Sequence, residues 1–124
     1  MVDPARVAMI LGDLSARLGI PAPRVVFTRT GTPYYENGVI YIPVDLPEDM
    51  VPRVVVHEFA HHLHSFYGVE PPRSVAEAFA SVFEEALHRL YKYPIGDDTT
   101  LLIGAALVAV STALRIKRLK QRVI

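Results

Sequence analysis

"VVHEFAHHLHSFYG", from Val55 to Gly68, places four histidines and one glutamate among apolar residues. The apolar residues recur at helical spacing from Val51 to Phe66, and Gly68 is a typical helix stop, so the stretch predicts a helix. At about 100° per residue, His57 and His61 lie one above the other, roughly opposite the apolar stripe. We therefore expect these two histidines to face away from the core.

The spacing His57-Glu58-Phe59-Ala60-His61 indicates a metal site. Histidines one turn apart can both turn a ring nitrogen to one zinc ion at about 2 Å, while Glu58 is angled to hold a water on the metal. Such a zinc ion promotes loss of a proton from the water, and Glu58 can accept that proton. Paired histidines also occur on helices without a metal, so the interpretation requires a third ligand.

Glu77, in "SVAEAFASVFEEAL" (74–87), is the candidate for that ligand. The segment 74–90 predicts a helix with Val75, Phe79, Val82, Phe83, Ala86, Leu87 and Leu90 on its apolar side. Glu77 falls on the opposite side, among alanines that let two helices approach closely. As an alternative, Ser74 and Glu77 match a capping box, in which Glu77 would only bond the helix start. Glu84, two turns further along, is a reserve ligand, and Glu70 lies in a proline-rich turn.

The rest of the chain predicts a small α+β domain. Asp3-Pro4 and Gly19 bound a first helix. Residues 24–29 are β-rich, and residues 34–35 and 39–42 flank Asn37-Gly38, a tight-turn signal. We therefore expect a small antiparallel sheet, followed by the histidine-bearing and glutamate-bearing helices.

Length and composition bound the function. The 124 residues suit one domain, and thirteen acidic residues balance thirteen basic ones, so the composition gives no reason to expect nucleic acid as a partner. The chain has no cysteine, so a transition metal would need nitrogen and oxygen ligands. The segment 1–17 lacks the pattern of a signal peptide.

From Arg24 to Leu90 the chain resembles the gluzincin metallopeptidases, and in size the single-domain minigluzincins. The resemblance rests on a strand or hairpin, a helix bearing "HEFAH" and a helix bearing a glutamate. It implies a zincin-like domain over residues 1–96, with one zinc ion per chain. The zinc ligands would be His57, His61 and Glu77, and Glu58 would be the general base and acid.

The resemblance also suggests roles around the metal. The strand before the active-site helix would be an edge strand that forms the upper rim of the cleft. It would bind an extended peptide through Val39, Ile40, Tyr41 and Ile42. Several gluzincins carry an aspartate four residues after the metal-binding glutamate, where it orients the first histidine. This chain has Ser81 there, whose hydroxyl could accept a hydrogen bond from His57.

Other side chains are candidates for stabilising the transition state. Such stabilisation usually needs a donor besides the metal, and three residues near the motifs qualify: His64, Tyr67 and His88. His64 shares the face of His57, but about 10 Å of helical rise separates the two, so it cannot bind the same ion. Tyr34 and Tyr35 fit the cleft rim or ordinary cross-strand packing. His62 is expected to be solvated.

Residues 97–124 form a separate segment, in which "TTLLIGAALVAVSTAL" (99–114) carries no charge. Sixteen helical residues span about 24 Å, against a hydrocarbon thickness of about 30 Å, and snorkelling of Arg115 extends the apolar helix to residues 99–116. This predicts membrane association through a C-terminal apolar helix with a basic tail. The alternatives are a helix buried in a soluble cytoplasmic protein or homodimer and, from the resemblance, a terminal segment that blocks the cleft.

The sequence predicts a zinc-dependent endopeptidase that hydrolyses peptides or unfolded proteins. One alternative is a catalytically silent zinc-binding or regulatory protein tethered by its C-terminal helix. Another is a metal-free helical adaptor.

Overall fold

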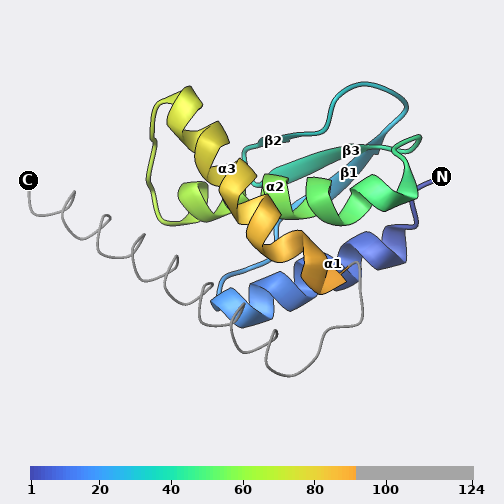
Figure 1. The fold of residues 1–124 in the computed structure, drawn as a ribbon, viewed down its shortest axis with the longest axis horizontal. Helices are drawn as coiled ribbons and strands as arrows, with labels where there is room; N and C mark the ends of the chain where they lie inside the picture. Colours follow the sequence, from blue (N-terminus) through green and yellow to red (C-terminus); the bar gives the residue numbers. More distant parts are fainter. Residues whose placement is uncertain (92–124) are drawn as a thin grey trace, which may run out of the picture.

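The computed structural model describes residues 1–91, in which three helices and a three-stranded mixed sheet form a small α+β domain (Figure 1). The helix α2 (Val51–Phe66) contacts the sheet and both other helices, α1 (Pro4–Leu18) and α3 (Arg73–Leu87). Short 3-10 helices precede α2 (Glu48–Met50) and follow α3 (His88–Tyr91). The helix with the histidine motif is therefore the central element of the described residues.

The sheet is mixed rather than antiparallel, which corrects the prediction. Its strands are β1 (Arg24–Thr28), β2 (Tyr34–Glu36) and β3 (Val39–Pro43), in the order β1-β3-β2. The hairpin pairs β2 antiparallel to β3, while β1 pairs parallel to the other side of β3. An Asn-Gly turn predicts only the pair of strands that it joins, and the position of β1 depends on long-range packing.

The strand order also corrects the predicted substrate-binding strand. Val39, Ile40, Tyr41 and Ile42 belong to β3, which is paired on both sides and is therefore the central strand. Ile40 and Ile42 are fully buried. The edge strand that contacts α2 is β2.

Local signals for turns and caps are confirmed. Asn37 and Gly38 both have positive φ, 50° and 80°, as a type I′ hairpin turn requires. The Asp3 carboxylate accepts a hydrogen bond from the Ala5 amide at 3.0 Å, which caps α1. Gly19, in the left-handed conformation, ends α1.

The core side of α2 follows the predicted stripe except at its end. Val51, Val55, Val56, Phe59 and Leu63 are fully buried. Phe66, expected in the core, is the last residue of α2 and is 40% exposed.

The apolar face predicted for α3 is partly wrong. Val75 and Val82 are 52% and 70% exposed, while Ala80, Phe83 and Leu87 are buried. In the described residues α3 packs mainly on α2 (Figure 1). Of the alanines expected to let the two helices approach closely, Ala80 is fully buried, whereas Ala78 is exposed.

The predicted apolar C-terminal helix (97–124, with its 99–116 span) lies outside the described residues. Within residues 1–91, no helix has the length and apolar character needed to cross a bilayer.

Candidate metal centre

His57 and His61 lie one turn apart on α2, and their ring centroids are 5.4 Å apart. The neighbouring residues Val55 and Val56 are fully buried on the core side of the helix. This fixes the rotation of α2, so that the two rings project toward α3. The side chains of both histidines are less than one fifth exposed.

Glu77 projects from α3 between these two rings. Its carboxylate oxygens lie 3.0 Å from Nε2 of His57 and 3.1 Å from Nε2 of His61. One donor atom from each of the three residues lies within 4.8 Å of the others, so the group can hold a metal ion. The capping-box alternative for Glu77 is wrong, because α3 begins at Arg73 without a side-chain cap.

The three side chains suit a divalent ion that prefers nitrogen and oxygen ligands. Burial lowers the pKa of His61, although the nearby Glu77 carboxylate raises it. The imidazole is thereby favoured in its neutral form, which is the form that binds metals. Two imidazoles and one carboxylate make the ligand set of a three-ligand zinc site.

Glu58 is buried at 7% exposure beside this group, at the wall of a cleft. Burial raises the pKa of its carboxyl to about 7, a shift that His57 opposes and Glu77 reinforces. A carboxyl with a pKa near neutrality can both accept and return a proton at physiological pH. Its position is therefore suited to acid–base chemistry.

The cleft has a volume of about 950 Å³. It is lined by residues drawn from segments 32–36, 54–65, 68–73 and 76–84, which belong to β2, α2, α3 and the loops beside them. All three candidate ligands and Glu58 line it. A molecule in the cleft can therefore reach both the three candidate ligands and the edge strand β2.

The residue beside the second nitrogen of His57 is Glu84 rather than Ser81. Glu84 Oε1 lies 3.1 Å from Nδ1 of His57, while Ser81 is exposed. Seven helical residues turn about 700°, so Glu84 points in nearly the same direction as Glu77, whereas Ser81 is rotated about 40° away. Glu84, the reserve ligand of the sequence prediction, thus contacts the ring nitrogen of His57 that does not face Glu77.

Arg53 binds the same Glu84 carboxylate, and sequence reasoning missed this residue. It donates a hydrogen bond to Glu84 at 3.0 Å and another to Glu85. The available signal was its position four residues before His57, on the same face of α2.

The three residues predicted to stabilise the transition state lie in different environments. His64 is buried, lines the cleft and packs its ring against Phe79, with centroids 4.5 Å apart. Tyr67 is buried with its ring against Phe66, outside the cleft lining. His88 is also buried outside that lining, where its Nδ1 donates to the backbone oxygen of Glu84 at 3.0 Å. Of the three, the structure brings only His64 to the cleft.

His62 was expected to be solvated, and this prediction is wrong. It is buried, and its ring joins α2 to two other parts of the domain. One nitrogen lies 2.8 Å from the Pro21 carbonyl oxygen and the other 3.0 Å from the Tyr35 hydroxyl. One residue beyond His61, the helix has turned about 100° toward the sheet.

Family models, curated proteins and solved structures yield no match to this chain. The fold and the site define a small α+β domain with a candidate metal centre in a cleft. The function is accordingly inferred from the residues that form this centre.

Proposed function

We propose that the chain is a zinc-dependent endopeptidase of the zincin type, similar to the minigluzincins. The observation that carries the proposal is the position of the Glu77 carboxylate, which meets both imidazoles of the His57–His61 pair. These three residues would hold one zinc ion per chain. A ligand set of two nitrogens and one carboxylate, without cysteine, is that of catalytic rather than structural zinc sites.

When bound, zinc would polarise a peptide carbonyl and ease deprotonation of a water molecule. Glu58 accepts a proton from the attacking water and transfers it to the amine nitrogen as the C–N bond breaks. Its burial supports this role, because the same burial that raises its pKa to about 7 lets the carboxyl work in both directions. His57, His61 and Glu77 would hold the metal ion, and Glu58 lines the same cleft.

The edge strand β2 supports a peptide as the substrate. Its residues Tyr34, Tyr35 and Glu36 line the cleft, and the strand uses one side for pairing with β3. An extended peptide can add to the other side as a further strand, with main-chain hydrogen bonds that require no particular sequence. This mode suits peptides and unfolded proteins.

The Glu58→Gln substitution tests the proposal. The variant should keep its zinc, measured by elemental analysis, because Glu58 is not a ligand. Its cleavage of an unfolded protein or a peptide library should fall by at least about 10²- to 10⁴-fold, the usual contribution of a general base. Glu48→Gln, at an exposed position outside the cleft lining, is the matched control and should keep the activity.

Equal cleavage by Glu58→Gln and the wild-type chain would reject the mechanism. Zinc binding by a wild-type chain that cleaves none of these substrates would instead favour a catalytically silent zinc-binding protein. A chain that purifies without zinc and fails to bind added zinc would reject both.

A further inference from the structure

We propose that Glu84 is the positioning residue for His57 and that Arg53 holds Glu84 in place. The inference rests on the proposed zinc site and adds to it the residues that aim one of its ligands. Neither Glu84 nor Arg53 is one of the three proposed zinc ligands.

The contacts form a chain across the α2–α3 interface. Arg53 and His57 lie one turn apart on α2, and the Glu84 carboxylate of α3 reaches both. One carboxylate oxygen lies 3.1 Å from Nδ1 of His57, and the other accepts a hydrogen bond from Arg53 at 3.0 Å. All three side chains are at most 30% exposed.

His57 consequently has a carboxylate at each ring nitrogen. Glu77 lies beside Nε2 and Glu84 beside Nδ1. A carboxylate only accepts hydrogen bonds, so once Glu77 and Nε2 of His57 bind a metal ion, Glu84 would accept the hydrogen bond from the proton on Nδ1. The lone pair of Nε2 is then available at the point where Glu77 and His61 converge, as metal-binding histidines generally require.

Arg53 explains how a long glutamate side chain can act as a fixed partner. A glutamate in water samples many rotamers, and one hydrogen bond to the His57 ring restrains it weakly. The charged bond from Arg53 holds the second oxygen and leaves the first directed at His57. Arg53 also bonds Glu85, which has no contact with His57 among the interactions of the described residues.

Glu85 therefore supplies a control that separates positioning from helix packing. Glu84→Ala and Glu85→Ala each remove one carboxylate of α3 from Arg53, and each loses one ion pair between the helices. Only Glu84→Ala also removes the partner of His57. A merely structural role predicts similar effects of the two substitutions on zinc binding.

The experiment measures zinc affinity of the full chain by competition with a chromophoric chelator. Glu84→Ala should weaken zinc binding by about 10- to 100-fold, the usual effect of losing the partner of a metal-bound histidine. Glu85→Ala should bind zinc as the wild type does. Arg53→Met should show a smaller loss, which disappears when it is combined with Glu84→Ala, because Arg53 acts only through Glu84.

A second measurement reads the histidine itself. With nitrogen-15-labelled histidine and bound zinc, the spectrum of the wild-type chain should show His57 protonated at Nδ1. In Glu84→Ala this signal should shift, while the signals of His61 stay in place. Arg53→Met reports on the same contact if Glu84→Ala fails to fold.

Wild-type zinc affinity and an unchanged His57 signal in folded Glu84→Ala would overturn the inference and leave the proposed function standing. Equal losses in Glu84→Ala and Glu85→Ala would also overturn it, in favour of helix packing. Failure of the wild-type chain to bind zinc would overturn the proposed function and this inference together.

Discussion

The hydroxyl oxygen of Tyr35 lies 3.0 Å from Nδ1 of His62, which ties the edge strand β2 to the helix α2 that carries the candidate metal ligands. The other ring nitrogen donates to the Pro21 carbonyl at 2.8 Å, and burial lowers the pKa of His62, so the ring is neutral. Nδ1 therefore accepts the hydrogen bond from Tyr35. This hydrogen bond holds β2, one wall of the cleft, against the helix that carries His57 and His61.

Removing this bond should change substrate binding more than the chemical step. Tyr35→Phe keeps the ring but loses the hydroxyl, which should cost about 0.5–1.5 kcal/mol of stability in urea unfolding. Because Tyr35 does not touch the reacting groups, KM should rise while kcat stays nearly constant. Tyr41→Phe on the central strand, outside the cleft lining, is the control. A fall in kcat alone would contradict this role of Tyr35.

Glu77→Ala should lose zinc. The substitution removes one of the three proposed ligands, so the loss in affinity should exceed the about 10- to 100-fold caused by losing an orienting partner. Elemental analysis after dialysis against a chelator measures the remaining metal. Glu70→Ala should retain zinc, and a Glu77→Ala chain that keeps one tightly bound ion would contradict the ligand assignment.

Zinc should stabilise the folded chain and restore activity after its removal. A chelator should abolish cleavage, and added zinc should recover it. At a free zinc concentration of about 100 times the Kd, binding to the folded state adds about 2.7 kcal/mol to the free energy of unfolding. Thermal unfolding of the wild type should therefore shift upward with zinc, and that of a His57→Ala, His61→Ala double variant should not.

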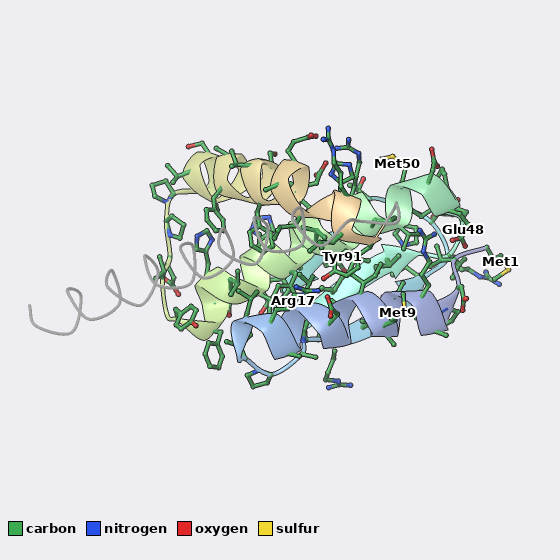
Figure 2. The ribbon with its side chains drawn as sticks, turned by 60° about the horizontal axis from the view of Figure 1, so that its bottom comes forward. Met1, Met9, Arg17, Glu48, Met50 and Tyr91 are labelled. Atoms are coloured by element: carbon green, nitrogen blue, oxygen red, sulfur yellow. The ribbon has the colours of Figure 1, made fainter. Side chains whose placement is uncertain are left out.

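Tyr91 should make stability sensitive to alkaline pH. Its hydroxyl donates to Asp13 at 2.7 Å, close to Arg17, which binds the same carboxylate oxygen (Figure 2). Burial, together with Asp13, raises the pKa of Tyr91 above its ordinary value. The stabilisation is thus complete below the unfolded-state pKa of about 10 and declines as the pH rises above it.

Tyr91→Phe measures this contribution. At pH 7 the variant should be less stable by about 1–2 kcal/mol, because it loses a hydrogen bond to a charged acceptor. Above about pH 10 the wild type should lose stability faster than the variant, so the two should converge. Urea unfolding at several pH values tests this, and parallel curves through pH 11 would contradict it.

Two phenylalanines of α2 should differ in their effect on stability. Phe59 is fully buried, so Phe59→Ala should cost about 3–5 kcal/mol through lost burial and the cavity that remains. Phe66 is 40% exposed, and Phe66→Ala should cost clearly less. Chemical unfolding of both variants compares them directly. Equal losses would show that Phe66 is part of the core, as the sequence pattern predicted.

Glu77, the favoured ligand, and Glu84, the reserve ligand, show how far helical periodicity alone can predict a site. Helical periodicity correctly placed Glu77 and Glu84 on one face of α3, because seven residues complete almost two turns. It could not say which carboxylate meets which nitrogen, since that depends on how α3 crosses α2. The contact between Arg53 and Glu84 depends on the same crossing of the two helices. Ser81, chosen through a resemblance, is exposed.

The sequence by itself determined what neighbouring residues impose on one another. The His57–His61 spacing, the Asp3 cap and the Asn37-Gly38 turn follow from backbone geometry within a few residues. The tertiary structure decided the parallel pairing of β1 with β3, the burial of His62 and the meeting of Glu77 with both imidazoles. These depend on contacts between segments far apart in the chain, whose geometry is set by the packing of whole helices and strands.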